Sequence, residues 1–491
     1  MTISSSIATT GGPSSGAVTG GKGGNITLTA ASGTVTVSNT LTADGNIGGS
    51  AGGTGGASGA ITISSQTVST GSAIYARGGA GLGSGGGGAG GAVSLTATST
   101  YISMGNVITT TGGVGAGGTN SAGFGNGGAG GAITMTAATY LNIPNAINSS
   151  GGAGAGGGNG GNGGAITGTA TSSYVNVANI ITTDGGNSGS GIANQSGGNG
   201  GAITFSAGDY FALSVALSGI GGSSRGTGTS TAANVSFTGT NGVAISNSIN
   251  LSATTTYGTL TINDGNSTVG GNNTGYTLGT LTLGALTKTG TGNFALVSPN
   301  GSWSGATTIT AGTITTGAAN VIPDASQLVF NGGKLHMGNY SETVSTIKIS
   351  DYSVLDLPVG NFTLTASASN GITWTNNKKL GINNWLGGYD GTGGGGSDPK
   401  FKMGTTNDLN ASHLAALYFR RTSNGSTYTA TQITGTGEIV PTGTLPVKLV
   451  SFTANKNNEE VVLQWETAAE INSDYFEILR GGSDMQWALA S

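Results

Sequence analysis

The segment Gly130-Gly131-Ala132-Ile133-Thr134-Met135-Thr136-Ala137 sets the pattern of this chain, because a glycine-rich run ends there and apolar residues then alternate with hydroxyl residues. Two more short apolar pieces follow, at Leu141 with Ile143 and at Ile147, before glycine returns. The same order recurs at spacings of 35, 32, 40, 33, 37 and 32 residues, from anchors at Ile26, Ile61, Val93, Ile133, Ile166, Ile203 and Val235. A repeat of this length predicts a solenoid, whose units bury their apolar edges by stacking.

Each repeat contains three short strand candidates. In Ile26-Thr27-Leu28-Thr29 the alternation places Ile and Leu on one face and Thr on the other, and Val35-Thr36-Val37 and Thr40-Leu41-Thr42 follow. Three strands per turn, paired in parallel between turns about 4.8 Å apart, describe a β-helix. The expected fold is therefore all-β: a parallel, right-handed β-helix solenoid with glycine-rich edge inserts, followed by an incomplete β-sandwich.

Glycine accounts for 99 of the 491 residues and is concentrated in inserts near 48–59, 78–91, 112–131, 151–164 and 185–201. Ordering a dozen glycines costs on the order of 12–24 kcal/mol, with almost no side chain to bury in return. The inserts therefore either stay mobile at one edge of the coil or hydrogen-bond to each other as stacked extended chains. Their recurrence at the same point of each repeat favours stacking.

The composition changes along the chain and suggests four parts. Residues 1–235 carry the glycine-rich repeats, 236–400 carry shorter repeats, 401–444 read as a cap on the open end of the solenoid, and 445–491 read as a truncated β-sandwich. Trp374 and Trp385 are expected to be core or cap anchors, and 408–417 is the helix candidate, capped by Asn410 or Ser412.

Two stretches resemble known families. Leu286-Thr287-Lys288-Thr289-Gly290-Thr291-Gly292, followed by Trp303 to Ile314, resembles the autotransporter-associated β-strand repeat, although Trp303-Ser304 stands where Tyr-Thr is usual. The earlier repeats more loosely resemble filamentous-haemagglutinin-type repeats. Both resemblances imply secreted, right-handed β-helices. Residues 446–491, including Asn472 to Arg480, are similar to the fibronectin-III-like domain that precedes the sorting tail of type IX secreted Bacteroidetes proteins.

Charge is scarce. The first two hundred residues contain only Lys22, Asp44, Arg77 and Asp184, and the net charge of the whole chain is −4. Without a basic stripe, nucleic acid is not an expected partner. The absence of cysteine rules out disulfides, and no apolar run approaches the ~18 residues of a membrane-spanning helix. Residues 2–12 read like the tail of a repeat, so the natural protein is expected to extend upstream; a frayed first repeat at a true start is the alternative.

Catalytic and metal-binding constellations are not expected. His336 and His413 stand far apart in the sequence with no carboxylate or cysteine beside them, so no metal or other cofactor is predicted. Asp44 and Asp184 fall at equivalent turns, where Asp is favoured for turn geometry, and they do not form a catalytic pair. The chain is therefore interpreted as non-enzymatic.

The strand pattern also predicts two outward ranks of hydroxyls. One explanation is purely structural, since Thr and Ser are good exposed strand residues. The functional explanations are a flat array that orders water, as in ice-binding β-helices, or a surface that contacts glycans. Tyr140, Tyr174 and Tyr210 precede the second strand of successive repeats, where they could stack on sugars or on each other. The candidate ranks contain Thr27/Thr29, Thr62/Ser64, Ser94/Thr96, Thr134/Thr136, Thr167/Thr169, Thr204/Ser206 and Ser236/Thr238.

Taken together, these features favour a secreted, extracellular or cell-surface repeat protein that acts as an adhesin or as a matrix or stalk component. Its expected partners are glycans, cell surfaces or matrix, and lateral or homotypic association is compatible with the pattern. Ice binding and a purely structural spacer are the alternatives.

Overall fold

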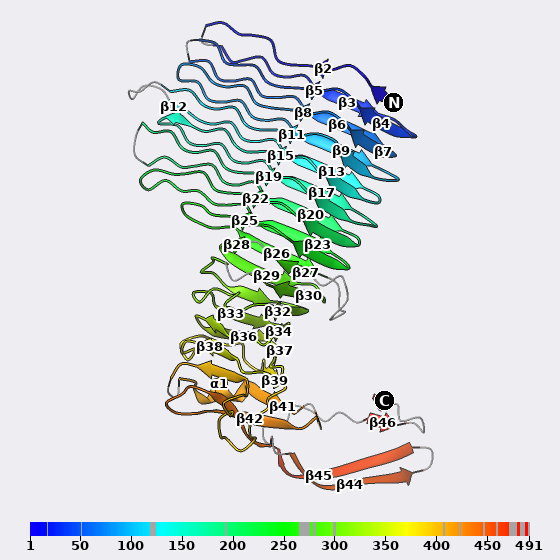
Figure 1. Ribbon diagram of the computed structural model, residues 1–491, viewed down its shortest axis with the longest axis vertical. Helices are drawn as coiled ribbons and strands as arrows, with labels where there is room; N and C mark the ends of the chain where they lie inside the picture. Colours follow the sequence, from blue (N-terminus) through cyan, green and yellow to red (C-terminus); the bar gives the residue numbers. More distant parts are fainter. Residues whose placement is uncertain are drawn as a thin grey trace.

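The computed structural model describes residues 1–16, 18–50, 52–117, 124–191, 194–264, 275–277, 281–297, 301–405, 408–421, 423, 425–444, 447–457, 460–470, 479–481 and 487–489. Within these residues the chain is almost entirely β-structure, with a single short helix, α1 (Ala411–Ala415). The strands stack as a long parallel coil whose N-terminal end is the wider one (Figure 1). The predicted parallel β-helix is confirmed.

The first strand of each turn joins a 12-stranded parallel sheet, called sheet 1 here. Its members are β3 (Ile26–Thr29), β6 (Ile61–Ser65), β9 (Val93–Ala97), β13 (Ile133–Ala137), β17 (Ile166–Ala170), β20 (Ile203–Ala207), β23 (Val235–Gly239), β26 (Thr259–Asp264), β29 (Ala285–Thr289), β31 (Thr307–Ile309), β33 (Leu328–Asn331) and β36 (Ile347–Asp351).

The second strand of each turn joins a 17-stranded sheet, called sheet 2, which is parallel until its last two strands. Its members are β1 (Thr2–Ile3), β4 (Thr34–Val37), β7 (Thr67–Thr70), β10 (Ile102–Met104), β14 (Leu141–Ile143), β18 (Val175–Val177), β21 (Tyr210–Leu213), β24 (Gly242–Ile245), β27 (Gly275–Thr277), β30 (Asn293–Leu296), β32 (Thr313–Thr316), β34 (Lys334–His336), β37 (Ser353–Asp356), β39 (Leu380–Asn383), β41 (Leu417–Arg420), β42 (Thr427–Gln432) and β43 (Ile439–Thr444).

The third strands are only two residues long and form the nine-stranded sheet 3. They are β2 (Ile7–Ala8), β5 (Leu41–Thr42), β8 (Ile74–Tyr75), β11 (Ile108–Thr109), β15 (Ile147–Asn148), β19 (Ile181–Thr182), β22 (Leu217–Ser218), β25 (Ile249–Asn250) and β28 (Leu281–Thr282). Further along, β35 (Glu342–Val344), β38 (Thr363–Ala366) and β40 (Lys400–Met403) form a three-stranded parallel sheet.

Aliphatic side chains fill the coil in register. Ile61, Ile133 and Ile203 belong to one column of sheet 1 in which each residue pairs directly with its neighbours above and below, and all three are fully buried. The column continues through Val235, Leu260 and Leu286. Burial of one such side chain contributes about 1.5–3 kcal/mol, so the stack provides the main favourable term of the fold.

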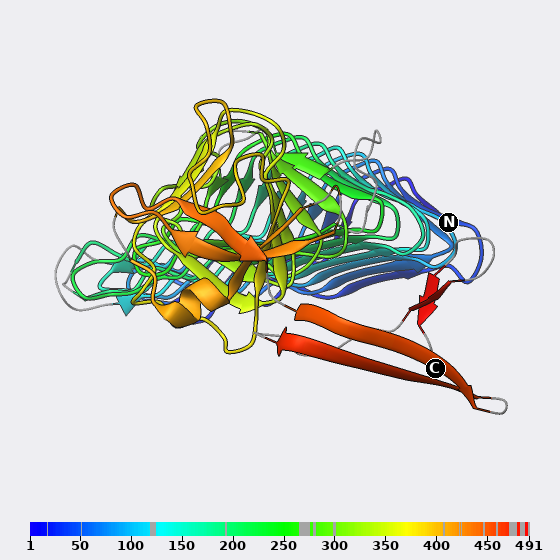
Figure 2. The same ribbon diagram turned by 90° about the horizontal axis from the view of Figure 1, so that it is seen from below.

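The glycine inserts are hydrogen-bonded to each other. Each one leaves sheet 3, turns, and returns to sheet 1, and the inserts project together from one edge of the coil (Figures 1 and 2). Backbone bonds run between successive inserts, for example from Gly79 N to Gly56 O, Gly113 N to Gly88 O and Gly152 N to Gly128 O. Of the two alternatives raised by the sequence, the structure shows the stacked one.

The hydrogen bonds of the inserts repeat every three residues, as from Gly87 N to Asn126 O and from Gly90 N to Ala129 O. A three-residue repeat without strand pairing is the geometry of extended polyproline-II-type chains, which satisfy their backbone only through neighbours. Within the inserts, the described glycines in the left-handed region lie near the tips, at Gly16, Gly52, Gly83, Gly156 and Gly226. The wide part of the coil is thus a lattice of extended chains, which we call the glycine lattice.

Close packing makes glycine obligatory within this lattice. A Cβ atom on Gly128 would lie 1.9 Å from the carbonyl oxygen of Gly88, and one on Gly113 would lie 1.9 Å from that of Gly79. No side chain fits at such distances, just as only glycine fits at the axis of collagen. The high glycine content is therefore a packing requirement.

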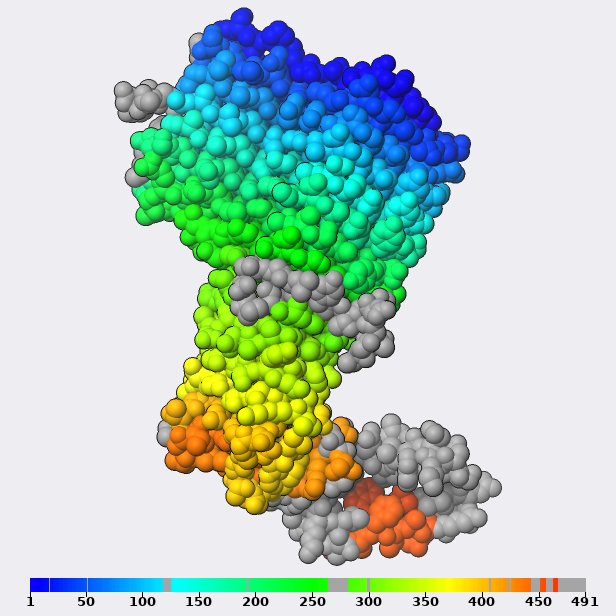
Figure 3. Space-filling view, viewed as in Figure 1, coloured from blue at the N-terminus to red at the C-terminus, as the bar shows by residue number. Residues whose placement is uncertain are grey.

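Below the glycine lattice the turns shorten and the body narrows (Figure 3). The turn length falls to 21 residues from Leu286 to Thr307 and from Thr307 to Leu328. Thr307 occupies a core position of sheet 1 and is fully buried, and its hydroxyl accepts a hydrogen bond from Trp303 Nε1 at 2.9 Å and bonds Ser326 Oγ at 2.8 Å. The hydrogen bond from the indole of Trp303 therefore satisfies the buried hydroxyl of Thr307 and allows a polar residue in the core column.

The region predicted as a cap ends the parallel stacking. Strand β41 still pairs with β39 in parallel, but β42 and β43 return antiparallel and cover the edge. Helix α1 is shorter than the predicted 408–417, and Asn410 is its N-cap, with its side chain accepting from His413 N. Trp374 and Trp385 are buried, as expected of anchors.

The last part contains two antiparallel pairs, β44 (Val447–Asn457) with β45 (Glu460–Glu470) and β46 (Leu479–Gly481) with β47 (Trp487–Leu489). Most of the predicted third strand, at 472–480, lies outside the described residues. The fibronectin-III-like sandwich therefore stays a prediction.

The inward and outward positions of one strand differ sharply in their expected cost of truncation. Ile133→Ala is expected to destabilise the chain by about 2–5 kcal/mol, because it leaves a cavity in the core column. Thr134→Ala, one residue along on the outer face, is expected to change stability by less than about 0.5 kcal/mol. Urea unfolding followed by far-UV circular dichroism measures both, and equal costs would contradict the assignment of faces.

The glycine lattice makes a second prediction. Gly128→Ala is expected to break the hydrogen bonds between neighbouring inserts, so that amide hydrogen exchange of 78–91 and 151–164 becomes at least tenfold faster. Gly12→Ala is the matched control, because a Cβ atom there meets nothing within 4 Å. Unchanged exchange in Gly128→Ala would show that the lattice does not depend on close packing.

Candidate functional site: the stacked outer face

The predicted hydroxyls form two straight ranks on the outer face of sheet 1. Thr134 pairs directly with Ser94 and with Thr167, and Thr136 pairs with Thr96 and with Thr169. The alternating strand geometry buries Ile133 and Met135 and leaves Thr134 and Thr136 exposed. The same pairing joins the remaining predicted positions: Thr27, Thr29, Thr62, Ser64, Thr204, Ser206, Ser236 and Thr238.

The first rank is longer than the sequence indicated. After Ser236 it continues through Thr261, Thr287 and Thr308, so ten successive strands present a hydroxyl, and Val329 ends the rank. These three residues were missed because the turn length changes there. The second rank carries seven hydroxyls and then Asn263.

The ranks continue without a break into the glycine lattice. Each returning insert runs directly into a strand of sheet 1 and exposes every third side chain. One column beside the ranks consists of alanines, at Ala60, Ala92, Ala132, Ala165 and Ala202, joined by backbone bonds such as that from Val93 N to Ala132 O. We call the ranks and these flanking columns together the stacked face.

Asparagines hold the outer columns of this face flat. Asn126 Oδ1 accepts from the backbone N–H of Asn159 at 2.8 Å, and Asn159 Oδ1 accepts from that of Ser196 at 2.9 Å. Asn162 Oδ1 similarly accepts from Asn199 N at 2.8 Å. Each amide oxygen is thus tied to the next turn, which fixes side chains that would otherwise rotate freely in water.

The dimensions of the stacked face follow from strand geometry. Neighbouring turns lie about 4.8 Å apart, and alternate residues of a strand lie roughly 6.7 Å apart. The first turn places Lys22 on this face, and small uncharged side chains occupy its columns in the later turns. Such a surface offers many weak, evenly spaced contacts.

Two aspartates of the wide part, Asp44 and Asp184, lie where inserts leave sheet 3, on the side away from the stacked face. Asp44 accepts from Arg77 N at 2.7 Å and from Arg77 Nε at 3.0 Å, and this hydrogen-bonded carboxylate raises the pKa of the guanidinium. Asp184 Oδ1 accepts from Ser218 Oγ at 2.7 Å and from Ile220 N at 2.8 Å. Both aspartates therefore tie one turn to the next, a role that the turn argument did not foresee.

The tyrosines form a ladder at the corner between sheets 1 and 2. The ring of Tyr140 stacks on Tyr101 at 4.6 Å and on Tyr174 at 5.2 Å, with interplanar angles of 12° and 11°. Both faces of Tyr140 are therefore covered by other rings, which leaves no face for a sugar. Burial, followed by the neighbouring phenols of Tyr101 and Tyr174, raises the pKa of Tyr140. Tyr210 stands one turn further along, at the start of β21.

One prediction about the histidines was wrong. His336 does have a carboxylate beside it, because its Nδ1 lies 2.9 Å from Asp356 Oδ2. Asp356 is twenty residues away in sequence but directly opposite in the parallel sheet, where it also accepts from Asn384 Nδ2 at 2.6 Å. Although burial opposes it, hydrogen bonding to His336 and Asn384 lowers the pKa of Asp356. Within the described residues, no group of three or more His, Cys, Asp or Glu gathers to hold a metal ion.

A buried acid lies in the narrower part of the coil. Glu342 is fully buried and accepts from Val321 N at 3.0 Å and from Ile322 N at 3.1 Å, so it closes the loop before β33. Burial raises the pKa of its carboxyl group to about 7, against the two backbone hydrogen bonds, which lower it.

Comparison of the chain with family models, with curated proteins and with solved structures found no match. In the described part of the chain, no helix has the length and apolar character needed to cross a bilayer. The family resemblances noted from the sequence therefore remain predictions.

Glu342 generates a prediction about pH. A carboxyl whose pKa is about 7 in the fold and 4.5 when exposed to water binds more protons folded than unfolded between these values, so its contribution to stability falls as pH rises through that window. The loss amounts to roughly 3 kcal/mol. Glu342→Gln does not titrate, so the difference in unfolding free energy between the two proteins should change from pH 4.5 to 7. A constant difference, measured by urea unfolding, would refute the shifted pKa.

Proposed function

We propose that this chain belongs to a non-enzymatic, extracellular surface protein that adheres through its stacked face, as an adhesin or as a stalk or matrix component. The observation that carries the proposal is the alignment of two hydroxyl ranks with columns of alanine and asparagine on one flat side of the coil. Glycans, cell surfaces and matrix are the proposed partners, and lateral association of copies is compatible with such a face. Secretion by the type IX route rests on sequence resemblance alone.

The physical argument concerns the number of contacts rather than the strength of each one. A neutral hydrogen bond exchanged with water contributes about 0.5–1.5 kcal/mol net. A rigid array needs no ordering on binding, so many weak contacts add with little entropic cost. A flat partner with a regular repeat gains most from this arrangement.

Binding of ice or ordered water is a second candidate, favoured by the length of the first rank. Ten successive strands present hydroxyls there, although Ser replaces Thr at Ser94 and Ser236. The flat alanine column next to the ranks would leave an ice lattice unobstructed.

A matched pair of substitutions within one turn tests adhesion. Ser94→Tyr places a ring on the stacked face, whereas Ser103→Tyr places one on sheet 2, and both serines are half-buried and outward-facing. Adhesion of the full chain to cells, immobilised glycans and abiotic surfaces is expected to fall at least tenfold in Ser94→Tyr and to persist in Ser103→Tyr. Equal adhesion by both variants would contradict a role of the stacked face.

The same two variants test the second candidate by thermal hysteresis. Hysteresis in the unmodified chain that disappears in Ser94→Tyr alone would establish ice binding in place of adhesion. Cleavage of a polysaccharide by a chain that adheres to nothing would overturn the non-enzymatic proposal as a whole.

A further inference from the structure

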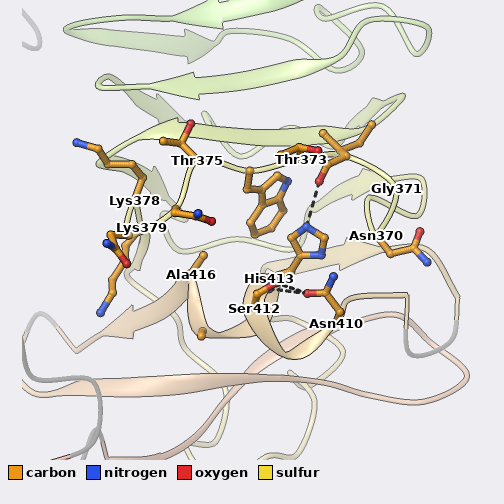
Figure 4. Close-up of a pocket in the computed structure, with 15 residues that line it drawn as sticks. Asn370, Gly371, Thr373, Thr375, Lys378, Lys379, Asn410, Ser412, His413 and Ala416 are labelled. Atoms are coloured by element: carbon orange, nitrogen blue, oxygen red, sulfur yellow. Dashed lines mark hydrogen bonds between the residues drawn. The ribbon is translucent and has the colours of Figure 1, made fainter.

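A polar cavity of about 640 Å³ opens in the C-terminal part of the coil (Figure 4), beyond Val329, where the first hydroxyl rank ends. One wall is the loop 370–379, which joins β38 to β39, and the other is helix α1 with its cap. A cavity of this volume lies within the range of small-molecule sites, about 300–1,000 Å³.

Two aromatic rings form the floor of the cavity and hold each other in place. Trp374 and His413 are 7% and 5% exposed, and their ring centroids lie 4.4 Å apart. Trp374 Nε1 donates to Ile347 O at 2.9 Å, and His413 Nε2 lies 3.1 Å from Ile372 O. Both rings are therefore fixed before any ligand arrives.

The bond to Ile372 also fixes the tautomer that a neutral imidazole adopts here. A carbonyl oxygen can only accept, so Nε2 carries the hydrogen, and Nδ1 of the neutral ring is left as an acceptor. Within the described residues, Nδ1 is buried and has no hydrogen-bond partner. Nδ1 is therefore an unsatisfied acceptor in the floor of the cavity.

The charge of the cavity is one-sided. The lining includes Lys378 and Lys379 and no aspartate or glutamate, in a chain whose acids outnumber its bases. Lys378 is already engaged, because its Nζ lies 2.7 Å from Asp351 Oδ1. Lys379 has no ion-pair partner in the part of the chain that the structure describes, so it is available to an anion.

The rest of the lining is rich in amides and hydroxyls. Asn370, Asn376 and Asn377 are exposed and make no side-chain hydrogen bond to other described residues, and Thr373 and Thr375 stand between them in the loop. Amides donate and accept at once, which matches a ligand with several hydroxyl groups. Asn377 has a φ of 61°, in the left-handed region that asparagine tolerates, so the bend of the loop is built into the sequence.

We propose that this cavity is a binding site for a small carboxylated sugar, with Lys379 facing the carboxylate and the loop asparagines facing the hydroxyls. The site lies apart from the stacked face, so it goes beyond the proposed adhesion, and either can fail without the other.

The experiment measures binding of D-glucuronate to the full chain by calorimetry, with neutral D-glucose, acetate and inorganic phosphate as comparison probes. Glucuronate is expected to bind saturably and about tenfold more tightly than glucose, because the two share a ring and differ in charge. Cross-peaks of Trp374 and His413 in ¹H–¹⁵N spectra should shift on addition. No saturable glucuronate binding up to 50 mM would overturn the proposal, and acetate or phosphate binding as tightly would overturn its sugar component.

Substitutions locate the site. Lys379→Gln is expected to weaken glucuronate binding about five- to tenfold and to leave glucose binding unchanged. Lys348→Gln makes the same charge change on β36, outside the cavity, and should alter neither. Asn376→Ala should weaken the binding of both sugars about threefold. Since the side chain of Asn376 is exposed, the melting temperature should stay constant. Equal effects of Lys379→Gln and Lys348→Gln would overturn the assignment.

Discussion

Parallel, in-register stacking of successive turns is the constraint on which the rest of the structure depends. Each turn donates its backbone hydrogen bonds to the next, and this fixes the register, as in the five successive pairs between β13 and β17. Because side chains alternate across a strand, a slip of one residue would expose the whole aliphatic column. The same register that buries Ile133 on Ile166 therefore aligns Thr134 with Thr167, so core and outer face are set by a single interaction.

The glycine lattice extends this principle to chains without useful side chains. An isolated glycine loop gains nothing from order and loses the most entropy. Stacking changes this balance, because the two legs of an insert bond each other, as Gly128 N does to Gly113 O, and each insert also bonds the next, as Gly113 N does to Gly88 O. The close approach that permits those bonds also excludes every other residue. The ordering is therefore collective, since one insert alone would lose the bonds that join it to its neighbours.

Much of the fold could be predicted from sequence because stacked turns place equivalent residues at regular spacings along the chain. Sheet 1, its buried column and the first seven turns of both ranks follow from the alternation of apolar and hydroxyl residues. The exceptions are positions where a local partner replaces the pattern. Gly168 occupies a core position because the ring of Phe205 fills its space, at 2.5 Å from where a Cβ would stand. Lys288 is fully buried in the same column, with its ammonium group donating to the carbonyl oxygens of Thr289 and Gly290.

The candidate sites also differ in whether their residues repeat along the chain. The stacked face repeats, so a sequence period reveals it, and the hydroxyls of Thr261, Thr287 and Thr308 escaped notice only where the period changed. The pair of His336 and Asp356 and the cavity floored by Trp374 and His413 occur once each. Their members are separated by 20 and by 39 residues and meet only because the coil brings distant turns together. Such contacts occur once and leave no period in the sequence, whereas the stacked face repeats with every turn.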